Sequence, residues 1–273
     1  MAAQLIDIES VVKSKLPQHY KKIPKWLFRF AAWLICQKEM NHVLITLDGK
    51  EGIEFADAMT QMLRVDYKIE GMENIPSEGR FIFTSNHPLG AFDGISCIKI
   101  LGQRYPKFKL IANDMLMHVH PLRSIFLPVN TLGAQNRRNM AAINEAYHDP
   151  EIQLMTFPAG FCSRFMEGKI QDVAWKKSVI TQAVESKRDI IPMYFEGRNS
   201  LFFYGLEWLR RMLGMKFNIG LILLPRQMMR HARGKTFGVR IGRPIPWQTF
   251  DDSRTPIQWA AWLREQTYLL KKN

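Results

Sequence analysis

One histidine and one aspartate, with five residues between them, have the right chemistry to move a proton. His87 follows the apolar segment 81–84, and Asp93 comes after a turn that Pro88 and Gly90 indicate. A carboxylate that holds one ring nitrogen of a histidine orients the imidazole, so that the other nitrogen can act as a base. Such a pair takes the proton from a hydroxyl as that hydroxyl attacks a carbonyl carbon. The structural alternative is that both residues only cap the helix that follows.

Two later segments support the chemical interpretation. Residues 156–164 read Thr-Phe-Pro-Ala-Gly-Phe-Cys-Ser-Arg, and residues 190–197 read Ile-Ile-Pro-Met-Tyr-Phe-Glu-Gly. Together with the block 86–93, their order and separation resemble the motifs of the glycerolipid acyltransferase superfamily, which includes the 1-acylglycerol-phosphate acyltransferases. The resemblance covers about residues 64–245.

The resemblance implies a reaction and a set of residues. A fatty acyl group would pass from acyl carrier protein or coenzyme A to an acceptor hydroxyl, with no metal ion or other cofactor. His87 would be the general base and Asp93 its orienting partner. The residues expected to bind substrate are Phe157, Pro158, Gly160, Ser163, Arg164 and Arg198.

Two departures from the family pattern narrow the acceptor. The family usually has four residues between His and Asp, whereas this chain has five. If all of them lay on one continuous helix, the side chains of His87 and Asp93 would point to different sides of that helix. The turn at 88–90 must therefore accommodate the additional residue. The His-Pro-x-Gly sequence with this spacing resembles that of the haemolysin-like branch of the family, which includes O-acyltransferases of amino-acid lipids. Ala159 also replaces a Glu that the family uses for glycerol phosphate. We therefore expect a lyso-glycine or lyso-ornithine lipid, with 1-acyl-sn-glycerol-3-phosphate as the alternative.

Other reactive side chains are weaker candidates. Cys162 lies in the second block but has no neighbouring base in sequence, so we expect a packing role. His118 and His120 lack an evident third ligand, and a structural or surface role is expected in place of a metal site.

The elements around these residues predict an α/β fold, with a central, mostly parallel sheet flanked by helices. Strand-like and helical segments alternate from residue 64 onward, which is typical of such sheets. The expected strands are residues 67–69, 80–84, 109–111, 125–129, 152–157, 190–195 and 236–241. The expected helices are residues 93–101, 137–147, 174–186, 201–213 and 256–270. We divide the chain into a helical, basic and apolar arm, 1–60, and an acyltransferase domain, 61–273.

Positive charge gathers in two segments. The chain has 38 Lys and Arg against 25 Asp and Glu, a net charge of +13. Residues 1–30 contribute +4 and residues 198–243 contribute +9, so the rest is neutral. Clustered positive charge favours an anionic partner.

A membrane surface is the anionic partner that fits best. Apolar side chains lie beside basic ones at 21–35 and at 201–233. The longest run without charge has 13 residues, whereas a spanning helix needs roughly 20. With only three Cys and no signal peptide, we expect a peripheral protein on the cytoplasmic face of the membrane. We expect no nucleic-acid partner, because a basic nucleic-acid-binding protein would leave the His87–Asp93 block unexplained. A catalytically inactive membrane adaptor is a second alternative, and a His87–Asp93 distance within hydrogen-bond reach would favour the enzyme.

Overall fold

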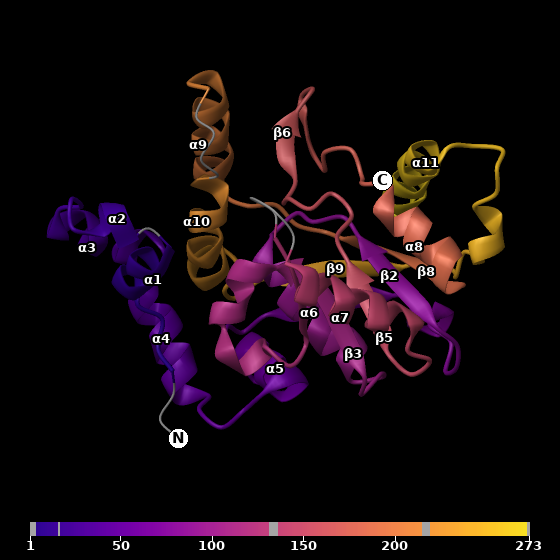
Figure 1. Cartoon of the computed structure of the whole chain (residues 1–273), viewed down its shortest axis with the longest axis horizontal. Coiled ribbons are helices and arrows are strands. Elements are labelled where there is room, and N and C mark those ends of the chain that lie inside the picture. Colours follow the sequence, from indigo (N-terminus) through magenta and orange to yellow (C-terminus); the bar gives the residue numbers. More distant parts are fainter. Residues whose placement is uncertain (1–3, 16, 131–135, 215–218, 272–273) are drawn as a thin grey trace.

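The chain folds around one mostly parallel β-sheet, which the computed structural model shows in Figure 1. The structure describes residues 4–15, 17–130, 136–214 and 219–271. Within these residues the sheet has seven strands, and each neighbouring pair is parallel except β8 and β9. Their spatial order is β1 (Asp66–Glu70), β9 (Thr236–Ile241), β8 (Asp189–Phe195), β2 (Phe81–Ser85), β5 (Gln153–Thr156), β3 (Phe108–Asn113) and β4 (Phe126–Val129).

Helices cover both faces of the sheet and bury it. Successive side chains of a strand point to opposite faces, so Phe81 and Phe83 of β2 join one core and Ile82 joins the other. The first core contains α5 (Gly52–Met62) and α6 (Ala91–Gly102). The second contains α7 (Arg137–His148), α8 (Ser178–Ser186) and α11 (Pro256–Leu269). All five residues of β2 are buried, so the end of this strand is held on every side.

The predicted α/β fold with a mostly parallel sheet flanked by helices is confirmed, and each of the expected strands lies in this sheet. Four elements differ from expectation. The hairpin β6 (Arg164–Met166) and β7 (Lys169–Gln171) and the helix α10 (Ile219–Arg226) were not predicted. Helix α8 begins at Ser178 and not at residue 174. In the segment before it, the main-chain N–H of Lys176 donates to the carbonyl of Pro158, and the indole N–H of Trp175 donates to Asp172.

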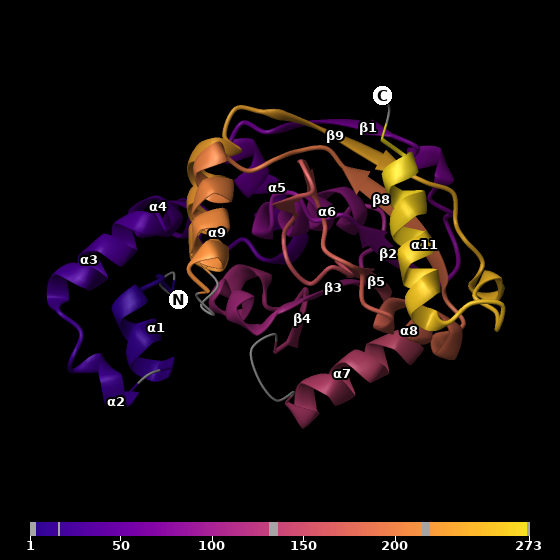
Figure 2. The same ribbon diagram turned by 90° about the horizontal axis from the view of Figure 1, so that it is seen from above.

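The N-terminal residues are helical, as expected. Figures 1 and 2 show α1 (Ile8–Lys15), α2 (Pro17–Tyr20) and α3 (Lys25–Leu34) projecting from one end of the sheet, and α4 (Gln37–Thr46) leading back to it. The expected boundary at residue 60 falls inside α5, whose residues Phe55, Ala56 and Met59 are buried in the core of the sheet. The part that projects therefore consists of α1 to α3.

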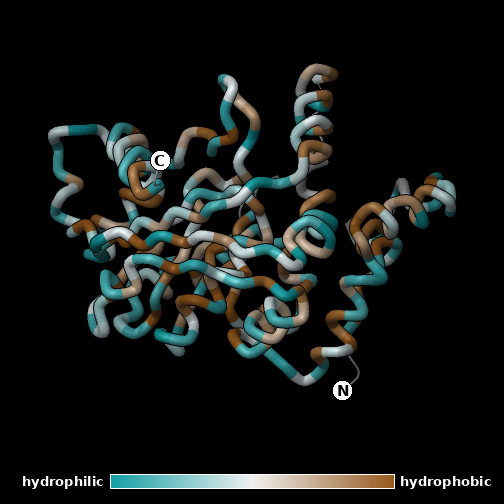
Figure 3. Tube along the Cα trace, turned by 180° about the vertical axis from the view of Figure 1, so that it is seen from behind, coloured by the Kyte–Doolittle hydropathy of each residue, from teal (hydrophilic) through white to brown (hydrophobic). Residues whose placement is uncertain are grey.

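Large apolar side chains are exposed on two helices at this end of the molecule. Helix α9 (Leu201–Met212) packs against α10, which lies directly below it in Figure 1 and also contacts α3. Figure 3 shows hydrophobic residues continuing onto the projecting arm, away from the sheet. The exposed side chains include Trp26, Phe30 and Trp33 on α3 and Leu201, Phe202 and Trp208 on α9. None of the helices in the described part of the chain is long and apolar enough to cross a bilayer.

Candidate active site

His87 and Asp93 meet just beyond the carboxyl end of β2. The Nδ1 atom of His87 lies 3.1 Å from Oδ2 of Asp93, whose side chain is fully buried. The ring N–H does not point straight at that oxygen, so the pair is close but imperfectly aligned. Catalytic hydrogen bonds are often poorly aligned before substrate binds and tighten afterwards. The distance therefore suits a base and its orienting partner.

The turn between the two residues absorbs the additional residue, as the spacing predicted. Helix α6 begins only at Ala91, and Gly90 before it has a φ of +72°, which favours glycine. A side chain at Gly90 would also collide with Leu224 of α10, because its Cβ would lie 2.4 Å from Cδ2. Asp93 then closes the turn, since its Oδ2 accepts the N–H groups of Leu89 (2.9 Å) and Gly90 (3.1 Å). The carboxylate thus caps α6 and faces His87 at the same time.

Opposing effects act on the charge of Asp93. Burial raises the pKa of its carboxyl group, because a charge is costly away from water. The neighbouring His87 and the N–H of Leu89 lower that pKa. Burial has the largest effect on this pKa, and the N–H of Leu89, which also fixes the turn, is one of the groups that favour the charged carboxylate.

Neighbouring strands hold the block around His87. The amide of Asn86 accepts the main-chain N–H of Phe195 at 2.7 Å and donates to its carbonyl at 2.9 Å, which ties the end of β2 to β8. On the other side, the ring of Phe157 stacks on the imidazole with 4.0 Å between centroids. The imidazole is left with one partly exposed edge; its side chain is 15% exposed.

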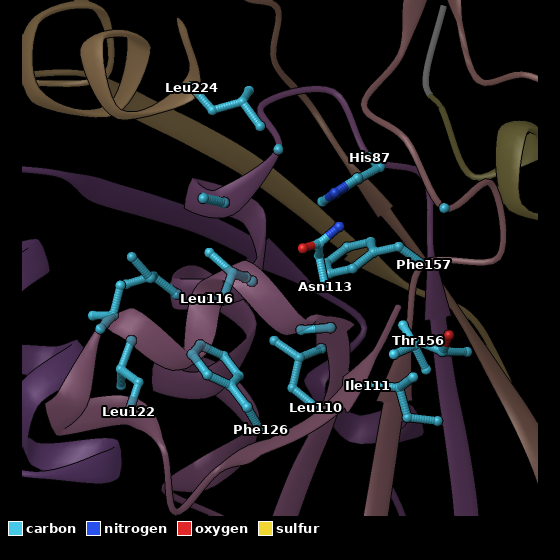
Figure 4. Close-up of a pocket in the computed structure, with 18 of the residues that line it drawn as sticks. His87, Leu110, Ile111, Asn113, Leu116, Leu122, Phe126, Thr156, Phe157 and Leu224 are labelled. Atoms are coloured by element: carbon cyan, nitrogen blue, oxygen red, sulfur yellow. The ribbon is translucent and has the colours of Figure 1, made fainter. Parts of the chain in front are cut away.

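A cavity of about 490 Å³ opens beside His87. Figure 4 shows His87 with Asn113 and Phe157 at one side of it and mostly apolar side chains at the other. Its lining reaches from Met40 and Leu44 of α4 to Val179 of α8. An apolar cavity with a few polar groups at one side suits a ligand with a hydrocarbon chain. Besides Phe157, the apolar side chains labelled in Figure 4 are Leu110, Ile111, Leu116, Leu122, Phe126 and Leu224.

Most of the predicted substrate-binding residues line this cavity with His87: Phe157, Pro158, Gly160 and Arg164. The structure places the other two elsewhere. Ser163 is buried, and its hydroxyl donates to Asp172. Arg198 is exposed and lines a separate, shallower pocket with His231 and Lys235.

Arg164 belongs to a group of charged side chains between β6 and α9. Its Nη1 lies 3.7 Å from the carboxylate of Glu207, which Arg210 contacts at 3.1 Å. Glu207 is buried, so the arginines compensate a charge that would otherwise be costly. The Nε–H of Arg164 is buried and donates no hydrogen bond among the described residues. A buried donor of this kind is suited to an anionic group that enters the cavity.

Asp172 is a buried carboxylate at this site that the sequence did not single out. It accepts hydrogen bonds from Ser163, Trp175 and the main chain of His87. No motif surrounds it in sequence, and only the folded chain brings it beside His87.

The weaker candidates take structural positions. Burial raises the pKa of the Cys162 thiol to about 12, so it stays protonated near neutral pH. His118 and His120 lie in short 3₁₀ turns. In the described ranges no three His, Cys, Asp or Glu side chains are grouped as metal ligands.

A sequence profile for acyltransferases matches residues 10–273, almost the whole chain. This chain belongs to the acyltransferase family. The resemblance predicted from the three blocks is confirmed, and the chain is an enzyme of the class expected. The interpretation as a basic protein without catalytic function is set aside.

Two relatives are similar over nearly their full length. A lyso-glycine lipid O-acyltransferase of Phocaeicola vulgatus is 41% identical over 267 residues, which cover 97% of this chain and 95% of that protein. Another of the same name, from Bacteroides thetaiotaomicron, is 40% identical over 97% of both chains.

A solved structure shares the fold. The crystal structure of the 1-acyl-sn-glycerophosphate (LPA) acyltransferase PlsC from Thermotoga maritima matches with a TM-score of 0.50 over 97% of this acyltransferase and 96% of that chain. Its sequence identity of 16% limits this likeness to the fold.

Proposed function

We propose that this acyltransferase moves a fatty acyl group from an acyl thioester to the hydroxyl of a lyso-glycine lipid. The observation that carries the proposal is the His87–Asp93 pair beside an apolar cavity. The choice of acceptor is supported by the names of the two relatives at 40–41% identity. Acyl carrier protein and coenzyme A are both suitable carriers of the thioester.

The reaction balances with His87 as the only proton carrier. Nε2 of His87 takes the proton of the acceptor hydroxyl while that oxygen attacks the thioester carbonyl. Asp93 faces Nδ1 and stabilises the imidazolium that forms. The tetrahedral intermediate then collapses, the carbon–sulfur bond breaks, and the imidazolium returns the proton to the leaving thiolate. One ester forms and one thiol is released.

Arg164 is the group that we propose binds the acceptor's carboxylate. It lines the cavity with His87, and its buried Nε–H is directed at no acceptor among the described residues. A glycine lipid ends in a carboxylate, with which a guanidinium forms strong, charge-assisted hydrogen bonds. Ala159, where the family has Glu for glycerol phosphate, is buried and adds no polar group.

We further propose that the enzyme acts at the cytoplasmic face of a membrane and is attached peripherally. The lyso lipid and its product are both membrane lipids, so the cavity must be loaded from a bilayer. The exposed aromatic side chains of α3, together with nearby lysines, provide a surface that suits an anionic bilayer.

The acceptor is tested with purified protein and two lyso lipids. Acyl thioesters of acyl carrier protein and of coenzyme A are each offered with lyso-glycine lipid or with 1-acyl-sn-glycerol-3-phosphate, and the products are identified by mass spectrometry. We expect the diacylated glycine lipid as the main product. A clear preference for the phosphate acceptor would overturn the choice of acceptor, and no transfer to either would overturn the function.

Arg164→Gln tests how the acceptor is held. Loss of the guanidinium should raise KM for the lyso-glycine lipid by about tenfold or more, because a charge-assisted hydrogen bond is lost. KM for the thioester should change little. Arg243→Gln, at an exposed position, is the matched control. An unchanged acceptor KM in Arg164→Gln would show that another group binds the carboxylate.

A further inference from the structure

The second carboxylate of the site, Asp172, is almost completely buried; the residue is 1% exposed. Its Oδ1 accepts the hydroxyl of Ser163 at 2.5 Å and the main-chain N–H of His87 at 3.2 Å. Its Oδ2 accepts the indole N–H of Trp175 at 3.0 Å. Three donors thus converge on this one side chain.

The contacts of Asp172 form a closed ring with the main chain of His87. Ser163, which donates its hydroxyl to Asp172, also donates its main-chain N–H to the carbonyl of His87 at 2.7 Å. The N–H and the C=O of His87 are therefore both held by the segments that follow β5. Asp93 acts only on the ring of His87, so the two carboxylates hold different parts of the same residue.

The C-terminal helix braces Asp172 from behind. The main-chain N–H of Asp172 donates to the hydroxyl of Tyr268 at 2.9 Å, and Arg264 donates to its carbonyl at 2.9 Å. Both residues are on α11 and the guanidinium of Arg264 lies over the ring of Tyr268. Residues more than ninety positions apart are thereby joined at the base of the active site.

Burying a carboxylate costs free energy, because its charge is removed from water. A carboxylate is therefore expected here only if its two oxygens accept hydrogen bonds that a neutral side chain would leave unmade. Burial raises the pKa of Asp172, while the bonds from Ser163, Trp175 and His87 lower it. Trp175 and the main-chain N–H can only donate, so the carboxylate with its two accepting oxygens satisfies all of them. An amide at this position would have one accepting oxygen.

We propose that Asp172 is a positioning residue that holds the main chain of His87 in place for catalysis. This inference rests on the proposed function of His87 as the general base. Asp172 does not face the cavity, and its effect is transmitted through the ring of contacts with Ser163 and His87. A displacement of the imidazole by about 1 Å can reduce a rate roughly 10²-fold.

The test compares Asp172→Ala, which removes every accepting atom, with Asp172→Asn, which keeps one oxygen for the N–H of His87. Asp252→Ala, at an exposed position, is the matched control. We expect kcat to fall by about 10²-fold in the Ala variant and by about tenfold in the Asn variant. KM for both substrates should stay within about twofold, because Asp172 touches neither.

Hydrogen exchange provides a measurement that needs no substrate. The main-chain amides of His87 and Ser163 should exchange at least about tenfold faster in Asp172→Ala, which removes the acceptor of the His87 N–H, than in the wild type or in Asp252→Ala. The exchange rates do not depend on which lipid is acylated. They would therefore test the role of Asp172 even if the lyso-glycine lipid were not the acceptor. A folded Asp172→Ala variant with wild-type kcat and wild-type amide exchange would overturn the proposal. So would a loss of kcat that is matched by an equal loss of folded protein.

Discussion

The carboxyl end of β2 and the projecting arm with α9 differ in which side chains they bury and which they expose. At the end of β2, the polar residues Asn86, Asp93 and Asp172 are buried, and each is hydrogen-bonded within the chain. On α3, in contrast, Trp26 is 65% exposed and Phe30 is 50% exposed. One region buries its polar groups, and the other leaves apolar groups in contact with water.

The contrast indicates that the two regions have different tasks. A buried polar group is stable only with its partners present, so the end of β2 is specified by contacts inside the protein. An exposed cluster of large apolar side chains marks a surface that another surface covers. Substitutions at the end of β2 should therefore change the rate of catalysis, and substitutions on the arm should change binding to membranes.

The largest effect is expected from His87→Ala. Loss of a general base typically costs about 10²–10⁴ in rate, and the fold should survive because the ring makes contact mainly with Phe157 and Asp93. Turnover is measured with the lyso-glycine lipid, and His148→Ala, on the exposed side of α7, is the control. The assignment of the base would be falsified if His87→Ala kept near wild-type turnover.

Asp93→Asn should come next, with a loss of at least about 10² in kcat. The amide keeps an oxygen that can accept the N–H groups of Leu89 and Gly90, so the turn should remain in place. What is lost is the negative charge beside Nδ1 of His87. Vesicle binding should be unchanged. A variant with normal kcat would mean that Asp93 serves only as the cap of α6.

The sequence predicted the end of β2 well because its elements are local. The apolar segment, the Pro88 and Gly90 turn and the start of a helix follow one another within a few residues, and the position of His87 beside Asp93 follows from them. Asp172 was missed because its link to His87, and its support by Tyr268, join segments that are distant in sequence and that only the fold assembles. Arg198 directly follows a matching block, yet it lines a pocket separate from the cavity beside His87.

The elements that the sequence did not predict were also missed because long-range contacts determine them. The hairpin β6–β7 is short, and helix α10 includes Pro225, so neither has a strong local pattern. Position and packing decide both: α10 places Leu224 against the turn at Gly90, and β6 carries Arg164 toward Glu207. Local propensity does not record such long-range contacts.

A smaller effect, on binding and not on catalysis, is expected from the double variant Trp26→Ser and Phe30→Ser. Loss of two large apolar side chains from a membrane contact should weaken binding to anionic vesicles by at least about tenfold. The kcat with detergent-dispersed lyso lipid should stay near that of the wild type. Binding is measured by sedimentation, with Ile257→Ser on α11, also an exposed apolar position, as the control.

Salt separates the two parts of this membrane contact. Lys21, Lys22, Lys25 and Arg29 lie beside the aromatic residues, and each contributes on the order of 1 kcal/mol near an anionic surface. Raising salt from about 0.1 to 0.5 M should weaken the electrostatic contribution of these basic residues to vesicle binding, whereas the contribution of the aromatic side chains should remain. Equal binding to neutral and anionic vesicles would exclude an electrostatic contribution to binding. No binding to either kind of vesicle would contradict the proposal that the enzyme binds membranes.

The smallest effect is expected at Cys162, where the two regions touch. Its side chain packs with Phe203 and Tyr204 of α9 and with Leu223 and Leu224 of α10, so it lies between the catalytic block and the exposed helix. Burial raises the pKa of this thiol to about 12, and at about pH 8 almost none of it is thiolate. Iodoacetamide should therefore leave the native enzyme active, whereas all three cysteines should react once the protein is unfolded. Loss of activity in step with alkylation of Cys162 would show that the two regions separate in solution. A catalytic part and a membrane-binding part could then not be treated as independent, because a motion between them would couple their activities.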